Sequence, residues 1–408
     1  MSGKRPLEGI RILDFSHAAA GPYATMILAD LGADVVKIEK PGRGDGARYM
    51  GAPMLGPLES DYYVSVNRNK RDILLDLQAE AGRDTALALA EKCDVVIQNF
   101  RPGVMDRLGL GFDDIRQRRP GIVYCSISAF GTSGPMASRP ANDIIMQSVS
   151  GIMGITGELG GGPVRVGAPI CDFATGLYGV IGILGALRVR DDHPEGQHIE
   201  LAMLDSTISL MANYVPSVVA LGKKVPRLGR AHAQIVPYQA FECADSAYVM
   251  VGAFTQGFWR RLCGAVGHEE WISDPRFATN ADRLASRDAL VSQLEPIFKE
   301  KTRAEWLEVL AEADVPASPV LEIGEALTSE QAVNNGVVLE AGRDGQSCPT
   351  AASPIRSVAW HDREVTSPPR MGEHTQEILA ELLDLDEGQI RQLLESGAAA
   401  GPEAETAR

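Results

Sequence analysis

The first forty residues alternate between short apolar runs and a segment with helical spacing. GIRILDFS (9–16) and DVVKIEK (34–40) are apolar runs of strand length, and AAGPYATMILADLGA (19–33) between them spaces its apolar residues as a helix does. A strand, a helix and a second strand of this length form a βαβ unit, in which the two strands are parallel. This unit constrains the fold strongly, because a parallel sheet needs helices over both of its faces.

The same alternation continues along the chain. A helical pattern over 79–92 is followed by strand-like runs at 94–100 and 121–130. These runs predict an α/β fold built on a parallel sheet. Ligands of such sheets gather at the carboxyl ends of the strands. The loops expected to matter are therefore those that follow strands: SHAAAG, EKPGRGDGAR, NFRPG and AFGTSGP.

The pattern changes near residue 225. We expect a second module at 230–325, with a strand over 239–254 followed by helices. A last helix is expected over 374–383, with Thr375 as its N-cap. The end of the chain, from Pro402, is expected to be a disordered tail.

The composition argues against several classes of protein. The net charge of −15 disfavours a nucleic-acid partner, because phosphates need a basic face. The apolar run at 177–187 is too short to span a bilayer, and the N-terminus shows no secretory signal, so we expect no membrane partner and a cytoplasmic location. The cysteines contain no CxxC pair, which argues against a disulfide framework or a zinc site: Cys93, Cys125, Cys171, Cys243, Cys263 and Cys348.

The first βαβ unit lacks a dinucleotide signature. Its turn, DFSHAAAGPYA, has no GxGxxG, although Glu39 stands where a ribose-binding acid would lie. NAD-type binding is therefore disfavoured. His17 in this turn is either a hydrogen-bonded structural residue or a catalytic one, and no nearby serine or cysteine forms an evident nucleophile–base pair with it.

A set of basic residues stands out in this acidic chain, mostly in loops after strands. One interpretation is a solvated surface, which is the usual place for Lys and Arg. The other is a phosphate-binding rim, because guanidinium groups pair with phosphate oxygens. The set comprises Lys37, Lys40, Arg43, Arg48, Arg68, Lys70, Arg71, Arg101 and Arg107.

One charge interrupts the apolar segment VGAPICDFATGLYGVIGILGAL (166–187), and it is Asp172. This residue is either the N-cap of a helix that begins at Phe173 or a buried acid paired with a cation. At a helix N-terminus, backbone N–H groups would keep the carboxylate ionised. An ionised, oriented carboxylate is a competent nucleophile.

Several segments, taken in order, resemble the class III CoA-transferases. This group includes formyl-CoA:oxalate and carnitine CoA-transferases and, as a relative, α-methylacyl-CoA racemase. The resemblance covers the chain to about residue 395 and rests on the following segments: GIRILDFSHAAAGPYATMILADLGADVVKIEKPGRGD, VNRNKRDILLDL, DVVIQNFRPG, SISAFGTSGP, PANDIIMQSVSGIMGITG, VGAPICDFATGLYGVIGILGAL, QAFECADSAYVMV, ADVPASPV and GEHTQEIL.

The resemblance implies a Rossmann-like large domain at 1–200 and 340–395 and a smaller α+β domain at 230–325. Segments 201–229 and 326–339 would be linkers, and 396–408 a disordered tail. It further implies an interlocked homodimer, in which each chain threads through the other.

The resemblance also implies a role for Asp172. In transferases of this kind the matching aspartate attacks an acyl-CoA thioester, which gives a mixed anhydride and then an aspartyl-CoA thioester, without a metal. Ala174, Gly176 and Gly179 would leave a tight, dry space for the thioester. Coenzyme A enters as part of a substrate, and its expected contacts are Ala18, Ala19, Lys40, Arg48, Leu75, Asn99, Phe100, Arg101, Arg107, Arg139 and Asp143.

The chain departs from two branches of the family. Formyl-CoA transferases carry Gln where this chain has Ala19, and racemases carry His where it has Asn142. We therefore expect a transferase that moves CoA between carboxylic acids, with succinyl-CoA as a candidate donor and Arg230, His232 and Gln234 as candidate contacts for a second carboxylate. The alternatives are an acyl-CoA racemase or isomerase and a non-catalytic CoA-binding protein.

Overall fold

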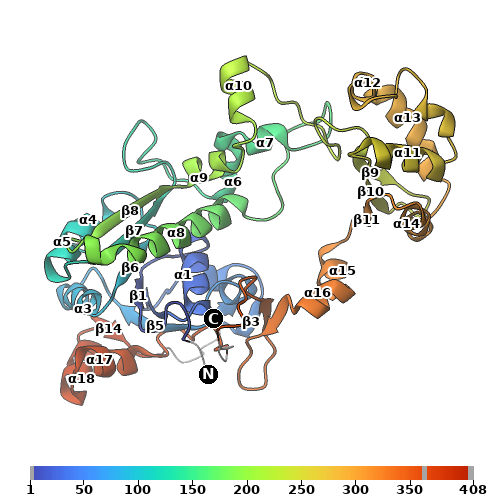
Figure 1. Cartoon of the computed structure of the whole chain (residues 1–408). Coiled ribbons are helices and arrows are strands. Elements are labelled where there is room, and N and C mark those ends of the chain that lie inside the picture. The colour runs from blue at the N-terminus through green and yellow to red at the C-terminus, as the bar shows by residue number, and fades with distance from the viewer. Residues whose placement is uncertain (1–3, 361–364, 403–408) are drawn as a thin grey trace. The chain divides into compact units, whose positions relative to one another are not determined.

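The structure is a computed structural model that describes residues 4–360 and 365–402. The chain divides into two compact units (Figure 1). The large unit holds the chain up to residue 152, then 165–222 and the chain from 334 onward, and the small unit holds 153–164 and 223–333. The small unit is thus wider than the expected 230–325 and includes a segment from the first half of the sequence.

The large unit is built on a seven-stranded sheet with the order β14-β5-β2-β1-β6-β7-β8. Six strands are parallel, and only β14 pairs antiparallel, with β5. The strands are β1 (Arg11–Asp14), β2 (Asp34–Glu39), β5 (Lys70–Leu75), β6 (Val95–Gln98), β7 (Val123–Ser128), β8 (Gln197–Ala202) and β14 (Ala399–Ala400). Strand order reverses beside β1, since β2 and β5 lie on one side of it and β6, β7 and β8 on the other, which is the Rossmann arrangement.

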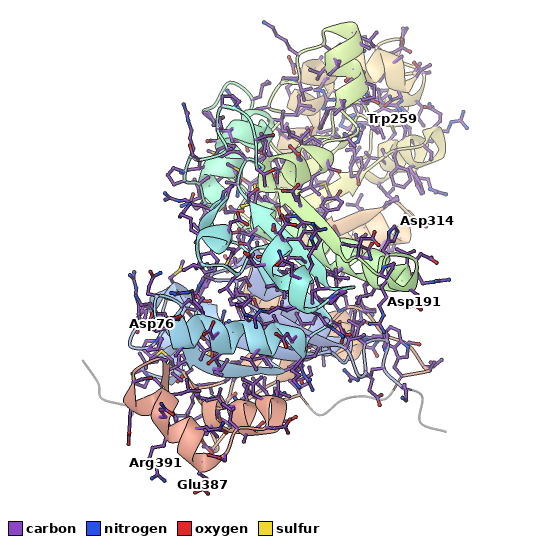
Figure 2. The ribbon with its side chains drawn as sticks, turned by 90° about the vertical axis from the view of Figure 1, so that its left-hand side faces the viewer. Asp76, Asp191, Trp259, Asp314, Glu387 and Arg391 are labelled. Carbon is purple, nitrogen blue, oxygen red and sulfur yellow. The ribbon has the colours of Figure 1, made fainter. Side chains whose placement is uncertain are left out.

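Helices cover both faces of this sheet (Figure 1). Because successive strand residues point to opposite faces, Ile12 packs under the first layer and Leu13 under the second. The first layer contains α1 (Ala20–Asp30), α6 (Asp143–Ser150), α8 (Ile170–Arg188) and α9 (Met203–Ser209). The second contains α3 (Glu80–Glu91), α5 (Phe112–Arg118), α17 (Thr375–Leu383) and α18 (Glu387–Glu395). Figure 2 shows Glu387 and Arg391 on the outer side of α18.

The remaining elements of the large unit are short. They are η1 (Gly46–Tyr49), β3 (Pro53–Gly56), β4 (Glu59–Ser60), α2 (Asp61–Val64), α4 (Val104–Arg107), η2 (Arg190–Asp192), α10 (Val215–Leu221), β12 (Val338–Glu340) and β13 (Pro349–Ala351). Helices α7 (Ile152–Ile155) and α16 (Glu330–Asn335) lie at the boundaries between the units.

The small unit packs helices on a three-stranded antiparallel sheet of β9 (Tyr238–Glu242), β10 (Tyr248–Gly252) and β11 (Ala317–Pro319). Its core contains Trp259, labelled in Figure 2, and Trp306, both almost fully buried. The helices are α11 (Gln256–Ala265), η3 (Glu269–Ile272), α12 (Asn280–Ala285), α13 (Arg287–Phe298), α14 (Arg303–Glu312) and α15 (Ile323–Thr328).

Two sequence-based expectations about elements are wrong, one at 239–254 and one at the end of the chain. The single strand expected over 239–254 is the β9–β10 hairpin, whose turn contains Ser246 with a positive φ of 61°. The expected tail is ordered as far as residue 402, because Ala399 and Ala400 pair with β5, while 403–408 lie outside the described residues.

Thr375 is the first residue of α17 instead of its N-cap, which is His374. Its hydroxyl oxygen accepts a hydrogen bond from the Leu74 N–H of β5, at 3.2 Å. The side chain therefore connects the helix to the sheet, and this long-range contact has no local sequence signal.

Helix α8 extends well beyond the apolar run at 177–187 and is long and apolar enough to cross a membrane by length and composition alone. The helix instead packs as a core helix of the large unit, against α1 and β8. A Cβ at Gly176 would lie 2.8 Å from the carbonyl oxygen of Ala20, and one at Gly179 would touch Ala24 and Leu201. The small residues after Asp172 therefore serve helix packing, because they let α8 approach α1 closely.

This packing predicts opposite effects on stability for two glycine-to-alanine substitutions in α8. Gly176→Ala places a methyl group against a backbone carbonyl, and we expect it to lower the free energy of unfolding by about 1–3 kcal/mol. Gly185→Ala meets open space, and we expect it to raise that free energy by about 0.5–1 kcal/mol, since alanine favours helix. Urea denaturation of both variants measures the difference, and equal effects would contradict the close approach of α8 to α1.

Candidate active site

A cavity of about 310 Å³ opens at the carboxyl ends of β1, β6 and β7. This is the place where strand order reverses, and there the loops after neighbouring strands diverge and leave space for a ligand. Asp172 lies in its wall. The other lining residues are His17, Ala18, Ala19, Ala20, Asn99, Phe100, Arg101, Pro102, Ile127, Ser128, Ala129, Ala137, Arg139, Pro140, Ala141, Asn142 and Met203.

Asp172 lies in the first turn of α8 but is not its N-cap, contrary to expectation. The helix begins at Ile170, two residues before Asp172, and Pro169 occupies the cap position without a side-chain hydrogen bond. The capping acceptor comes from another helix. Oδ1 of Asp143, the first residue of α6, accepts hydrogen bonds from the backbone N–H groups of Cys171 at 2.8 Å and Asp172 at 3.3 Å.

The environment of Asp172 favours its protonated form. Burial, together with the negative charge of Asp143, raises the pKa of the Asp172 carboxyl to about 7. The phenol of Tyr62, on α2, also has a raised pKa, because of its own burial and then the charges of Asp172 and Asp143. The expectation that the helix N-terminus would keep Asp172 fully ionised is therefore wrong, since desolvation and a like charge outweigh that effect.

Two acceptor side chains from other loops fix the turn after β1. The His17 N–H donates to Asn99 Oδ1 at 2.9 Å, and Asn99 Nδ2 donates back to the His17 carbonyl at 2.8 Å. The Ala18 N–H donates to Asp45 Oδ1 at 3.0 Å. Ala18 has a φ of 62°, a left-handed conformation that a residue with a Cβ adopts only at a cost of about 1–2 kcal/mol. Asn99 and Asp45 hold the turn in that conformation.

The buried cation of Lys37 also holds this turn, through its backbone and through Asp45. Lys37 Nζ donates to the Ser16 carbonyl at 2.7 Å and to Asp45 Oδ2 at 3.0 Å, and its side chain is fully buried. Burial lowers the pKa of His17, and so does the charge of Lys37, so the imidazole is neutral near pH 7. The His17 ring meets the edge of Phe100, with ring centroids 5.1 Å apart.

A second cavity, of about 230 Å³, lies beside the first, because His17 and Phe100 line both. Its walls are mainly apolar, with Lys40 among the lining residues. The apolar side chains are Phe15, Ile38, Leu75, Leu77, Phe100, Val104 and Leu108. A flat apolar ring with a charged attachment fits such a wall.

The structure brings most of the expected CoA contacts to these two cavities. Ala18, Ala19, Asn99, Phe100, Arg101 and Arg139 line the first with Asp172, while Lys40, Leu75 and again Phe100 line the second. Arg48, Arg107 and Asp143 line neither. Arg107 is exposed on α4, and Asp143 accepts hydrogen bonds from the first turn of α8.

Arg48 is 1% exposed and forms an internal ion pair. Its Nη2 donates to Glu39 Oε1 at 2.7 Å, and its guanidinium lies 3.8 Å over the Tyr63 ring. Glu39, which stands where a ribose-binding acid would lie, is therefore already bound to Arg48. Others of the basic set are paired in the same way: Lys70 with Asp14, Arg68 with Asp30 and Arg71 with Asp34.

The candidate contacts for a second carboxylate belong to the small unit. Arg230 lies over the Tyr248 ring and is 3.8 Å from Glu295, and the His232 ring stacks on Tyr238. His232 Nδ1 accepts a hydrogen bond from the Gln234 N–H at 3.1 Å.

Sequence reasoning missed Lys37 and Asp45 as supports of the turn. A lysine inside an apolar strand and an acid in a basic, glycine-rich loop are unusual, and this combination is the available signal for a buried ion pair. Among the residues that the structure describes, no group of three His, Cys, Asp or Glu side chains is placed to hold a metal ion.

Known proteins match both the sequence and the fold. Residues 7–375 match the family model of CoA-transferase family III. The chain is 38% identical to a mouse succinyl-CoA:glutarate CoA-transferase, over 96% of this chain and 90% of the relative, and 38% identical to an acetyl-CoA:oxalate CoA-transferase of Acetobacter aceti, over 83% and 87%. A crystal structure of a CAIB/BAIF family protein from Brucella suis superposes with a TM-score of 0.85 at 35% identity, over 93% of this chain and all of that one. The Rossmann-like sheet, the cavity at its switch point and matches that run almost the full length of the chain lead to one assignment: the chain belongs to CoA-transferase family III and is a CoA-transferase.

Proposed function

We propose that this enzyme moves CoA from an acyl-CoA donor to a carboxylic acid through a covalent intermediate on Asp172. The observation that carries the proposal is the position of this carboxylate in the wall of the first cavity, next to the apolar second cavity. A carboxylate nucleophile gains reactivity when water is excluded from it. The raised pKa of Asp172 reports such an environment.

The proposed chemistry runs through two kinds of intermediate. The Asp172 carboxylate attacks the thioester carbonyl, which forms a mixed anhydride and releases CoA as a thiolate. The thiolate then attacks the aspartyl carbonyl, which gives an aspartyl-CoA thioester and frees the donor acid. The acceptor carboxylate attacks this thioester, which forms a new anhydride and again releases the thiolate. Attack of the thiolate on the acceptor's acyl carbon yields the new acyl-CoA and regenerates Asp172.

The two cavities suggest how CoA is bound. The adenine ring would occupy the apolar second cavity against Leu75, and the thioester end would reach Asp172 past Phe100. Lys40, Arg101 and Arg139 line the cavities and would meet the phosphates, with Arg107 close by on α4. Arg48 is not assigned to a phosphate in this proposal, because its ion pair with Glu39 is buried.

The substrates we propose are dicarboxylic acids, with succinyl-CoA as donor. The mouse relative carries succinyl-CoA and glutarate in its name, and the Acetobacter relative carries oxalate. A second carboxylate on the acid would need a cationic contact, for which Arg230 and His232 are candidates. We also propose that the enzyme acts in the cytoplasm as an interlocked homodimer, as the sequence resemblance implies.

An acceptor screen tests the substrate class. We expect the enzyme, given succinyl-CoA and one acid at a time, to form new acyl-CoA with short dicarboxylates faster than with monocarboxylates, as measured by mass spectrometry. Monocarboxylates that react equally well would contradict the proposed class. Solvent deuterium appearing at the α-carbon of an acyl-CoA without any acceptor would favour a racemase instead.

Removal of the nucleophile tests the mechanism. We expect Asp172→Ala and Asp172→Asn to lower kcat by about 10⁴-fold or more, since neither side chain can form the anhydride. In the wild type, hydroxylamine should trap an acyl group on the peptide that contains Asp172. A variant that keeps more than about a tenth of the activity would contradict the covalent route.

The raised pKa of Asp172 also predicts a stability effect. A carboxyl with a higher pKa in the folded state than in the unfolded state destabilises the fold as pH rises through that interval, here from about 4 to about 7. Asn cannot ionise, so the stability of Asp172→Asn relative to wild type should increase by roughly 1–3 kcal/mol between pH 5 and pH 8. Urea denaturation at both values measures it, and a constant difference would show that Asp172 titrates normally.

A further inference from the structure

Gln147 lies one helical turn after Asp143 on α6, and its side chain is fully buried. Its Nε2 donates to Asp143 Oδ2 at 2.7 Å and to the Val166 carbonyl at 3.3 Å. Its Oε1 accepts a hydrogen bond from the Val166 N–H at 2.8 Å. The carboxamide therefore joins α6 to the segment that leads into α8.

The two carboxylate oxygens of Asp143 bind different helices, one α6 and the other α8. Oδ2 meets Gln147, and Oδ1 meets the first N–H groups of α8 at Cys171 and Asp172. A helix leaves its first N–H groups without partners, and Pro169 at the cap position has no side-chain acceptor. The orientation of the first turn of α8 thus depends on the Asp143 carboxylate, whose rotation Gln147 restricts.

An amide side chain at position 147 can bind Asp143 without neutralising it. A Lys or Arg at 147 would neutralise Asp143 and favour ionisation of Asp172, whereas an amide donates a hydrogen bond and leaves the negative charge uncompensated. The other titratable groups around Asp172 are Tyr62 of α2, Cys171 beside it, and His17 and Arg139 in the cavity wall. Cys171 donates its backbone N–H to Asp143, and its thiol also interacts with that carboxylate. None of the other three donates a hydrogen bond to Asp143 among the bonds found in the described part of the chain.

We infer that Gln147 is a positioning residue for CoA transfer: it fixes Asp143, and Asp143 fixes the first turn of α8 and with it the carboxylate of Asp172. The inference rests on the proposed function, in which Asp172 is the nucleophile. Gln147 itself is buried and does not line the cavity.

Two variants and one control test the inference in the full-length enzyme. Gln147→Leu removes all three hydrogen bonds, and we expect kcat to fall about 10- to 100-fold. We expect KM for the acyl-CoA to stay within about twofold of wild type, because the side chains to which the proposed function assigns CoA, such as Lys40 and Arg101, lie on other loops. Thr375→Val is the control, since it also leaves a buried N–H, that of Leu74, without its acceptor, but on the other side of the sheet. We expect its kcat to stay within about twofold of wild type.

Gln147→Glu supplies a readout that a purely structural role would not change. Two carboxyl groups at hydrogen-bond distance share one proton, so a protonated Glu at 147 donates to Asp143 while its other oxygen accepts from Val166. Near pH 7 we expect the kcat of this variant to be within about threefold of wild type. As the pH is raised further, its kcat should fall, because the pair of carboxyl groups loses its shared proton. The wild type has an amide without a titratable proton and should hold its kcat there.

The outcomes separate the two proposals. A wild-type kcat in Gln147→Leu, or an unaltered pH profile in Gln147→Glu, would overturn the positioning role while transfer by the wild type still stands. If Gln147→Leu unfolds, as thermal denaturation would show, Gln147→Glu alone decides. A wild type that transfers no CoA, or Asp172→Asn with full activity, would instead overturn the proposed function on which the inference rests.

Discussion

The buried ion pair between Lys37 and Asp45 is the interaction on which the site depends. It connects strand β2 to the loop that follows it, and both partners also bind the backbone of the turn after β1, at Ser16 and Ala18. Burying two charges is unfavourable unless each is fully hydrogen bonded, and removal of one partner from such a pair typically costs about 3–5 kcal/mol. The pair is therefore a poor source of net stability but a strict constraint on geometry. It fixes a left-handed turn that forms one wall of the cavity with Asp172.

Similar pairs continue across the sheet beneath the cavities. Lys70 of β5 meets Asp14 of β1, and Arg48 meets Glu39 at the end of β2. Burial and the charge of Glu39 raise the pKa of Asp72, which lies 3.9 Å from Arg48, well above its usual range. The interior of the sheet beneath the two cavities is thus polar and held by ion pairs, which explains why many basic residues of this acidic chain are not available to phosphates.

The fold could be predicted from the sequence where its signals are local. Apolar runs and helical spacing gave β1, α1 and β2 to within a few residues, and the expected position of ligands at the strand ends agrees with the cavity around Asp172. The errors concern contacts between distant residues. Arg48 has the same sequence signal as Lys40, yet one is buried against Glu39 and the other lines a cavity. Likewise, the start of α8 depends on Asp143, nearly thirty residues earlier, so the local pattern placed it too late.

In the proposed mechanism, the position of Asp172 must meet two demands that oppose each other. A nucleophilic carboxylate must be ionised when it attacks, but it must also be poorly solvated, since water would stabilise its charge and lower its reactivity. The fold meets the second demand through burial and through Asp143, at the expense of the first, and the pKa of about 7 is the result. Asp143 accepts hydrogen bonds from N–H groups of α8 and from the Gln147 amide, and in the described part of the chain no cationic side chain forms a salt bridge with it. The same carboxylate therefore both orients the first turn of α8 and, together with burial, raises the pKa of Asp172.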